Sequence, residues 1–220
     1  DRWVKKNKLN NIITISKDDQ TADYSAVKVS DKELSVKTPY EPEFKLRVVN
    51  TESHNIMNIL FSIALASEIG ARSEHILSAM NDYDGVDGRS KIYKGINNSR
   101  IIDSSYNANP QSFKASINDL LSCTGKHWVV MGQMGELGKK SEEYHVNLAL
   151  YAAKNHIDKL FIITEHNQAV IGAFGDNAHA FSSTSDLIDF IKPLVKNDTN
   201  ILVKASRFMR FETIVDDLKL

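Results

Sequence analysis

The sequence is poor in cysteine and proline, and it has no long hydrophobic run. Of its 220 residues, one is cysteine and four are proline. Cys123 cannot form an internal disulfide without a second cysteine, which is typical of a reducing compartment. The longest apolar runs fall far short of the ~20 residues that a transmembrane helix needs. No basic segment followed by an apolar one opens the chain. We therefore expect a cytoplasmic protein without membrane insertion.

An excess of charge of one sign is also lacking. Lysine and arginine number 27 against 28 aspartate and glutamate, for a formal net charge of −1. Because nucleic acids and anionic membranes select basic surfaces, neither partner is predicted. The seven histidines show no H-E-x-x-H or Cys/His spacing, so no metal site built by the chain alone is predicted. A hydrophobic content of 42% suffices for one or two ordinary cores.

A P-loop of the form G-x-x-x-x-G-K-[ST] is missing as well. Gly125-Lys126 lacks the upstream glycine and the following hydroxyl residue, and Gly138-Lys139 is followed by a second lysine. These residues therefore do not supply the loop that cradles the phosphates of a nucleotide in P-loop enzymes.

The first part of the chain has the pattern of antiparallel strands followed by helices. Alternating apolar residues at 27–29, 34–36 and 44–48 predict strands with one solvated face. Two helices follow over about 54–69 and 73–82, and the first is apolar on nearly all sides, which predicts burial within a larger layer. The glycine- and aspartate-containing stretch 83–88 predicts a linker.

After residue 88 the pattern alternates between strand and helix. Strands are expected near 100–103, 127–131, 159–164, 178–181 and 200–204, and helices near 110–122, 141–155, 167–173, 184–195 and 208–218. This alternation predicts an α/β fold with a mainly parallel sheet and helices on both faces.

The segment Ile101–Pro110, with the sequence IIDSSYNANP, places polar side chains where a hydrophobic strand ends. Pro110 suits the first turn of a helix, and Asn109 can cap it. The residues between strand and helix would then lie at the carboxyl end of the strand, where open α/β sheets bind ligands. The same residues are typical of a turn with a helix cap, so the pattern alone leaves both interpretations open.

Five short blocks, including this segment, resemble the Mur ligases in their order along the chain. The blocks are His54–Asn58, Gly88-Arg89, Asp103–Pro110, Gly132–Gly138 with His145, and Leu202–Arg207 with Glu212. The Tyr-Asn-Ala-Asn sequence resembles in particular the branch that adds D-alanyl-D-alanine (D-Ala-D-Ala) to UDP-N-acetylmuramoyl-tripeptide (UDP-MurNAc-tripeptide) in peptidoglycan synthesis. The resemblance implies the end of the central ATP-binding domain over 1–88, a Rossmann-like carboxy-terminal domain over 89–220, and a monomer.

The resemblance also implies residue roles. Asn55 and Asn58 correspond to residues at the adenine of ATP, Arg89 to one at its phosphates, and Asp103 with Ser104 to residues at its ribose. Tyr106, Asn107 and Asn109 correspond to residues that face the dipeptide. Lys204, Ser206 and Arg207, expected at the start of the helix over 208–218, would suit a carboxylate or phosphate, with Lys204 or Arg207 brought to the reaction. For His145, a hydrogen-bonding role on its helix is the alternative to a role in the site.

The sequence departs from the family pattern at three positions within the five blocks. Ser104 replaces a second acidic residue, Gln133 an aspartate and Ala205 a glycine. Two alternatives therefore stay open: a non-catalytic homologue that binds a nucleotide or peptide, and a sister ligase of the folylpolyglutamate type. By the resemblance, the parent enzyme uses ATP and Mg²⁺, and its P-loop and Mg²⁺ ligands precede residue 1. The chain alone is then expected to be inactive.

Overall fold

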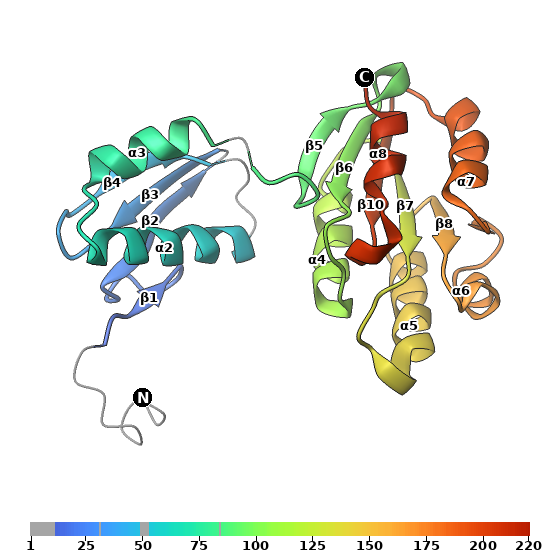
Figure 1. The fold of residues 1–220 in the computed structure, drawn as a ribbon, viewed down its shortest axis with the longest axis horizontal. Helices are drawn as coiled ribbons and strands as arrows, with labels where there is room; N and C mark the ends of the chain where they lie inside the picture. The colour runs from blue at the N-terminus through green and yellow to red at the C-terminus, as the bar shows by residue number, and fades with distance from the viewer. Residues whose placement is uncertain (1–11, 31, 49–52, 84) are drawn as a thin grey trace. The chain divides into compact units, whose positions relative to one another are not determined.

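The computed structural model describes residues 12–30, 32–48, 53–83 and 85–220, and the side chains of Ser53 and His54 lie outside this description. The chain divides into two compact units, Asp1–Asp84 and Gly85–Leu220 (Figure 1). The change of pattern expected after residue 88 thus falls just inside the second unit. In the described part of the chain, no helix combines the length and hydropathy needed to cross a bilayer.

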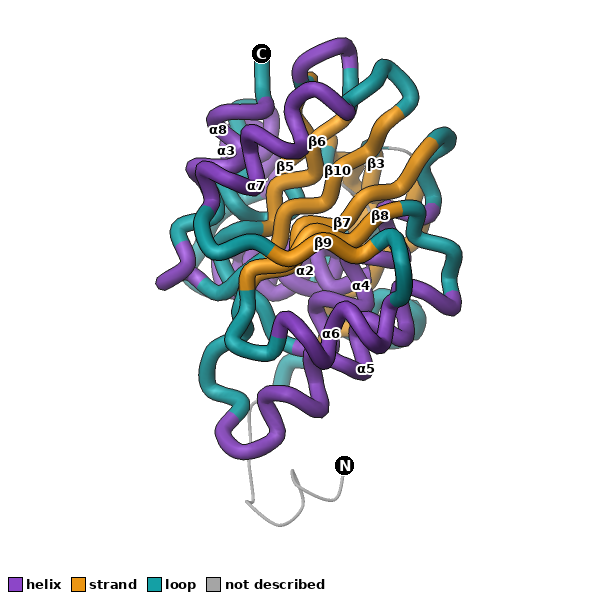
Figure 2. Tube along the Cα trace, turned by 90° about the vertical axis from the view of Figure 1, so that its right-hand side faces the viewer, coloured by secondary structure: helices purple, strands orange, loops and turns teal. Residues whose placement is uncertain are grey.

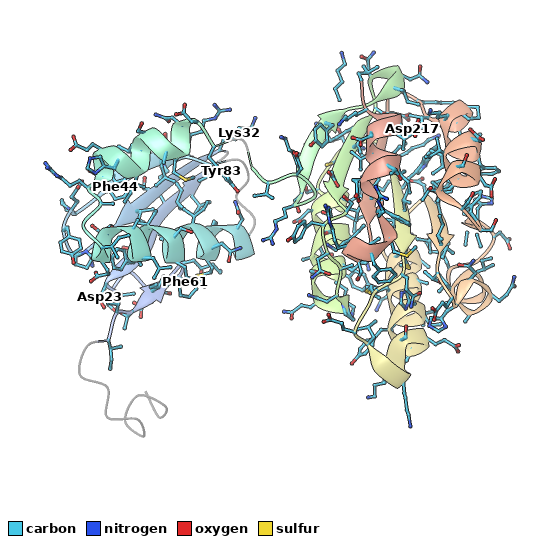
Figure 3. The ribbon with its side chains drawn as sticks, in the orientation of Figure 1. Asp23, Lys32, Phe44, Phe61, Tyr83 and Asp217 are labelled. Atoms are coloured by element: carbon cyan, nitrogen blue, oxygen red, sulfur yellow. The ribbon has the colours of Figure 1, made fainter. Side chains whose placement is uncertain are left out.

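The first unit contains a four-stranded sheet in the order β1-β2-β3-β4. The strands are β1 (Ile15–Ser16), β2 (Tyr24–Ser30), β3 (Glu33–Lys37) and β4 (Phe44–Arg47). β2, β3 and β4 pair in antiparallel fashion as predicted. β1 was not predicted, and it pairs parallel to β2. Asp23, labelled in Figure 3, fixes this pairing because its Oδ2 accepts bonds from the backbone N–H (2.8 Å) and hydroxyl (2.6 Å) of Thr14.

Helices α2 (Ser53–Glu68) and α3 (Ser73–Asn81) complete the first unit. Ile56, Leu60 and Ile63 of α2 are buried against strand residues such as Tyr24 and Leu34. Phe61 and Leu65 of the same helix are 49% and 70% exposed in the described structure, and Phe61 is labelled in Figure 3. Within the described residues of this unit α2 buries one face, so the larger layer that was predicted to bury the helix is not seen there.

The second unit contains a six-stranded sheet in the order β5-β6-β10-β7-β8-β9. The strands are β5 (Lys91–Lys94), β6 (Arg100–Ser104), β7 (Lys126–Gly132), β8 (Lys159–Ile163), β9 (Ala178–Ala180) and β10 (Thr199–Lys204). All neighbouring pairs are parallel except β5 with β6. The predicted α/β class and mainly parallel sheet are confirmed, whereas β5 was not predicted.

Helices cover both faces of this sheet (Figure 2). One face carries α4 (Pro110–Leu121), α5 (Ser141–Lys154) and α6 (Asn167–Phe174), and the other carries α7 (Thr184–Ile191) and α8 (Glu212–Leu218). Successive residues of β7 supply both cores, because Val129 and Met131 pack with α4–α6 while Trp128 and Val130 pack with α7 and α8. On the second face, Lys192 also pairs with Asp217 of α8 at 2.9 Å (Asp217 is labelled in Figure 3).

Two predicted helices differ in their bounds. α7 ends at Ile191 and continues as a 3₁₀ turn over Lys192–Leu194, where Pro193 has no N–H to donate. The last helix begins at Glu212, after a 3₁₀ turn over Arg207–Met209 and Arg210 at φ 54°. Lys204 and Ser206 therefore precede a 3₁₀ turn that begins at Arg207, and the prediction that these three residues lie at the start of an α-helix is wrong.

Candidate functional site at the carboxyl ends of β6, β10 and β7

Three parallel strands end together and bring most of the predicted site residues to one edge of the sheet. Lys204, the last residue of β10, is in register with Ser104 of β6 and Met131 of β7. The segments 105–109, 132–138 and 205–207 therefore meet at this edge, and Gly88 and Arg89 join them through contacts with Asp103 and Tyr106. The prediction that the IIDSSYNANP segment runs from a strand through polar residues to a proline that opens a helix is confirmed.

Asp103 organises this edge through buried hydrogen bonds. It is 3% exposed, and its Oδ1 accepts bonds from the backbone N–H (3.0 Å) and the hydroxyl (2.7 Å) of Ser105. Its Oδ2 accepts a bond from the backbone N–H of Gly88 at 3.0 Å. Both carboxylate oxygens thus hold the surrounding loops, and contact of Asp103 with a ribose stays a prediction.

Gly88 allows the chain to pass close to Tyr106. Its φ is +79°, a conformation that costs glycine little, and a Cβ here would lie 2.9 Å from the backbone nitrogen of Tyr106. The same nitrogen donates a bond to the carbonyl oxygen of Gly88 at 3.0 Å. The backbone of Tyr106 is therefore tied to the residue that precedes Arg89.

Two guanidinium groups lie over the ring of Tyr106. The Cζ of Arg89 is 4.6 Å and that of Arg207 is 5.4 Å from the ring centroid. Tyr106 itself is 39% exposed. Among the residues that the structure describes, no ion pair is formed by Arg89 or Arg207. We call these two residues the arginine pair; their common contact with Tyr106 was not predicted.

The side chains of Lys204 and Ser206 link the loops through hydrogen bonds to their backbone groups. Lys204 is 5% exposed, and its Nζ donates a bond to the carbonyl oxygen of Asn107 at 3.0 Å. The Oγ of Ser206 accepts a bond from the N–H of Gly135 at 2.9 Å and donates to the carbonyl oxygen of Ala108 at 3.5 Å. Both side chains thus fix the loop after β6 to its neighbours, so their role in binding a substrate stays a prediction.

The asparagines of the loop after β6 are exposed, as a contact with a substrate requires. The Oδ1 of Asn109 accepts a bond from the N–H of Ser112 at 2.8 Å, which confirms the predicted cap of α4. The Oδ1 of Asn107 accepts a bond from the N–H of Ala108 at 2.8 Å. Their contact with a dipeptide stays a prediction.

Ser104 and Ala205, two of the departures from the family pattern, are buried. Ser104 is 2% exposed, with its Oγ 3.3 Å from that of Ser90, so a ribose reaches it only if the loop moves. Ala205 is fully buried against Gly132, where an added Cβ would lie 2.5 Å from the Cβ of Ala205. The alanine methyl fills space that Gly132 leaves.

The third departure, Gln133, lies in a polar network that also holds His145. The Nε2 of Gln133 donates to Ser141 Oγ at 3.2 Å, and the Nε2 of His166 lies 3.0 Å from the same hydroxyl. His145 is fully buried; its Nε2 accepts from the N–H of Met134 at 3.0 Å while its Nδ1 donates to the carbonyl oxygen of Ser141 at 2.7 Å. Burial lowers the pKa of His145, so the neutral ring is favoured. The structure thus shows for His145 the hydrogen-bonding role that was the alternative to a role in the site. The place of His166 in this network was not predicted.

Asn55 and Asn58 belong to the first unit, on the first turns of α2. Asn58 is exposed, and Asn55 is half-buried. The side chain of His54 lies outside the described residues, so its predicted place on one face with Asn58 is not described.

Within the described ranges, no group of three or more His, Cys, Asp or Glu side chains could hold a metal ion.

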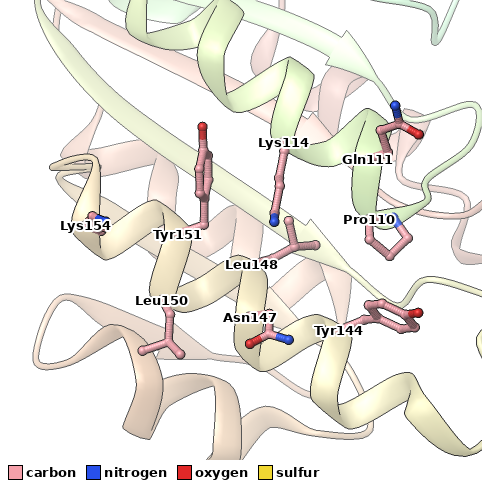
Figure 4. Close-up of a pocket in the computed structure, with 9 residues that line it drawn as sticks. All are labelled: Pro110, Gln111, Lys114, Tyr144, Asn147, Leu148, Leu150, Tyr151 and Lys154. Carbon is pink, nitrogen blue, oxygen red and sulfur yellow. The ribbon is translucent and has the colours of Figure 1, made fainter.

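A groove of about 540 Å³ lies between α4 and α5 (Figure 4). Its lining includes Lys114, Tyr144, Tyr151 and Lys154, and the Nζ of Lys114 is 5.4 Å from the ring centroid of Tyr151. None of the predicted site residues lines it. A second hollow, of about 380 Å³, lies in the first unit beside Ser67 and Glu68, at the end of α2 opposite Asn55 and Asn58. Neither of these two hollows is lined by a residue of the strand-end cluster.

Comparisons with known proteins identify relatives of this chain. Residues 88–207 match the family model "Mur ligase, glutamate ligase domain". The UDP-N-acetylmuramoyl-tripeptide--D-alanyl-D-alanine ligase of Escherichia coli (strain K12) is 33% identical over 168 residues, which are 76% of this chain and 37% of that protein. The ligase of the same name from Bacillus subtilis (strain 168) is 30% identical over 177 residues, 75% of this chain and 38% of that protein. The aligned region thus spans about two fifths of the length of these relatives.

Solved structures agree in fold. A crystal structure of MurF from Acinetobacter baumannii matches with a TM-score of 0.84 and 25% identity, covering 98% of this chain and 49% of that one. A MurF ligase from Thermotoga maritima, in complex with ADP, matches with a TM-score of 0.76 and 20% identity, over 99% of this chain and 51% of that one. At that identity the second likeness shows the fold alone.

Proposed function

The chain belongs to the Mur ligase family, and we propose that it forms the carboxy-terminal portion of an ATP-dependent enzyme that adds D-Ala-D-Ala to UDP-MurNAc-tripeptide. The observation that carries this proposal is the cluster at the ends of β6 and β10. There the arginine pair, which has no carboxylate partner among the described residues, lies in the same cluster as exposed amide side chains. Further support comes from relatives whose names state this reaction. The enzyme would be a cytoplasmic monomer in peptidoglycan synthesis.

The proposed reaction has two steps. The terminal carboxylate of the tripeptide attacks the γ-phosphorus of ATP, which gives an acyl phosphate and ADP. The amino group of D-Ala-D-Ala then attacks the acyl carbon, loses a proton, and expels inorganic phosphate as the amide forms. Both steps move negative charge between oxygens, so catalysis rests on positioning and on fixed positive charge.

Residues of this chain supply parts of both requirements. The guanidinium groups of Arg89 and Arg207 match phosphate oxygens in shape and can donate two parallel hydrogen bonds to them. The exposed amides of Asn107 and Asn109 can donate to the dipeptide carboxylate and accept from its N–H groups. Buried Lys204 and Ser206 hold the loop that carries both asparagines.

ATP enters as a co-substrate, and Mg²⁺ as its counter-ion. Because the described residues offer no metal-binding cluster and the sequence has no P-loop, we assign neither Mg²⁺ nor the γ-phosphate cradle to this chain. Asn55 and Asn58 would contact the adenine. The 220-residue chain alone is expected to release no phosphate in the presence of ATP, UDP-MurNAc-tripeptide and D-Ala-D-Ala; release that depends on all three would contradict this.

Titration of the ¹⁵N-labelled chain with D-Ala-D-Ala tests the proposal. We expect the amide resonances of Tyr106, Asn107 and Ser206 to shift with D-Ala-D-Ala and much less with L-Ala-L-Ala. N107A should weaken the response, whereas N147A, which alters an exposed asparagine of α5, should leave it unchanged. Equal responses to both isomers, or none, would contradict the proposal. A selective response to L-glutamate would favour the folylpolyglutamate-type alternative.

A further inference from the structure

We propose that Tyr106 is a positioning residue that holds Arg89 and Arg207 together as one binding unit for a phosphate group. Arg89 precedes β5 and Arg207 follows β10, so nothing local in the sequence places them together. The ring of Tyr106 is the contact that they share. This inference deepens the proposed function, and it rests on that function for the identity of the phosphate.

The energetic argument begins with the charges. Two guanidinium groups near each other repel, whereas the negative face of an aromatic ring attracts each of them. In the described structure neither Arg89 nor Arg207 has a carboxylate partner within ion-pair distance. The ring thus offsets part of the repulsion, and the remaining positive charge is available to an anion from outside.

A second tyrosine with two cations over its ring differs from Tyr106, because carboxylates neutralise its cations. Tyr93 also has two cations over its ring, Lys91 at 5.5 Å and Lys219 at 5.2 Å. Those lysines pair with carboxylates, Lys91 with Asp87 at 3.1 Å and Lys219 with Asp216 at 2.6 Å. The cluster around Tyr93 is thus internally neutralised, whereas no carboxylate of the described residues neutralises the arginine pair.

The backbone on both sides of the ring is held in place. Tyr106 donates its N–H to Gly88, the neighbour of Arg89, at 3.0 Å. Ser206, the neighbour of Arg207, donates its N–H to the carbonyl oxygen of Gln133 at 3.1 Å and bonds Gly135 through its hydroxyl. The two guanidinium groups therefore extend from fixed points, and little ordering is needed when an anion binds.

The chemistry of the pair selects phosphate over carboxylate. One guanidinium satisfies a carboxylate through two parallel hydrogen bonds, whereas a phosphate has a third oxygen and a higher charge for a second guanidinium. The phosphate chain of a nucleotide and the single phosphoryl group of the acyl phosphate share this chemistry. Inorganic pyrophosphate and inorganic phosphate represent these two sources as probes.

The first test measures the position of the arginine pair without any ligand. Ring currents of Tyr106 should shift the side-chain NMR signals of Arg89 and Arg207 away from those of exposed Arg72. Y106L should abolish both shifts, and Y106F should keep them. Unshifted signals in the unaltered chain would overturn the inference, and this result does not depend on whether Y106L folds.

The second test measures anion affinity by titration of the 220-residue chain with pyrophosphate and, separately, phosphate. Y106L should bind the preferred anion about fivefold more weakly, while Y106F stays within about twofold of the unaltered chain. Y93L, the matched control, should bind as the unaltered chain does. R207Q should weaken binding less in Y106L than in the unaltered chain, because the pair is already separated. Unchanged affinity in a folded Y106L chain would overturn the inference.

The two proposals fail in different ways. If Y106L loses pyrophosphate or phosphate affinity but D-Ala-D-Ala shifts no resonance, the positioning role stands and the ligase assignment fails. If D-Ala-D-Ala binds selectively while Y106L, Y106F and the unaltered chain bind both anions equally, the positioning role fails and the ligase assignment stands.

Discussion

The carboxylate of Asp103 accepts a hydrogen bond from the backbone N–H of Gly88 at 3.0 Å, and so joins the end of β6 to the residue before Arg89. Two further bonds come from Ser105. We expect D103N to lower the free energy of unfolding by ~1–3 kcal/mol, because an amide N–H₂ group replaces one buried acceptor and leaves a donor unsatisfied. Chemical denaturation measures this difference.

The control for D103N is D87N. Asp87 is exposed and accepts bonds from Lys91 and Tyr93 at the surface, so its amide variant should leave the unfolding midpoint almost unchanged. Equal losses in the two variants would show that burial of Asp103 is not what makes its bonds important.

Gly132 provides the sharpest packing test. In G132A the new methyl group would lie 2.5 Å from the Cβ of Ala205 and 2.7 Å from the ring of Phe211, so we expect a loss of ~1–3 kcal/mol in unfolding free energy. G132A combined with A205G should recover part of that loss, since Phe211 still obstructs. G172A is the control, because open space surrounds Gly172 within α6 and alanine favours a helix. No recovery in the double variant would contradict the predicted contact.

Asn109 separates capping from substrate binding. N109A should cost ~1 kcal/mol because α4 loses its cap, whereas N109S should keep most of the stability. If the amide also contacts the dipeptide, N109S should bind D-Ala-D-Ala more weakly than the unaltered chain. Full binding by N109S would restrict Asn109 to its structural role.

His145 should make stability depend on pH. Burial lowers its pKa in the folded chain, so the unfolded chain binds a proton more readily and the folded state loses stability as pH falls. The loss should begin near the ordinary histidine pKa of about 6.5 and level off below the lower folded-state pKa. His166 and Glu165 are the titratable groups whose charges act on the ring.

The measurement for His145 is the unfolding midpoint between about pH 8 and pH 5. H145Q should flatten the decline, while H75Q, at an exposed histidine, should leave it as it is. An identical pH profile in H145Q would contradict the assignment of the decline to His145.

Strands and helix starts that have a local physical cause could be predicted from the sequence. The apolar runs of β7 and β8 and the Asn109-Pro110 start of α4 have short-range physical causes, so they could be identified from the sequence. β5 escaped prediction because Lys91–Lys94 is a short edge strand with Ile92 58% exposed, which weakens its apolar signal. The start of α8 depends on Arg210 at a positive φ, which arginine rarely adopts.

The candidate site was predictable as a set of residues but not as an arrangement. The strand-to-helix junction indicated where polar groups would gather, and the family resemblance indicated which ones. Both carboxylate oxygens of Asp103 accept hydrogen bonds from loop residues, and Tyr106 contacts both arginines. These contacts form because the fold brings together loops from distant parts of the chain. Such contacts leave no periodic signal in a single sequence.

The most direct test of the ligase assignment replaces the aligned segment of the Escherichia coli relative with this chain and measures the product by mass spectrometry. We predict ATP-dependent conversion of UDP-MurNAc-tripeptide and D-Ala-D-Ala to the joined product, with R207Q strongly reducing the rate. A chimera that folds and binds ATP and UDP-MurNAc-tripeptide, yet forms no product with D-Ala-D-Ala or joins another amine instead, would contradict the assignment.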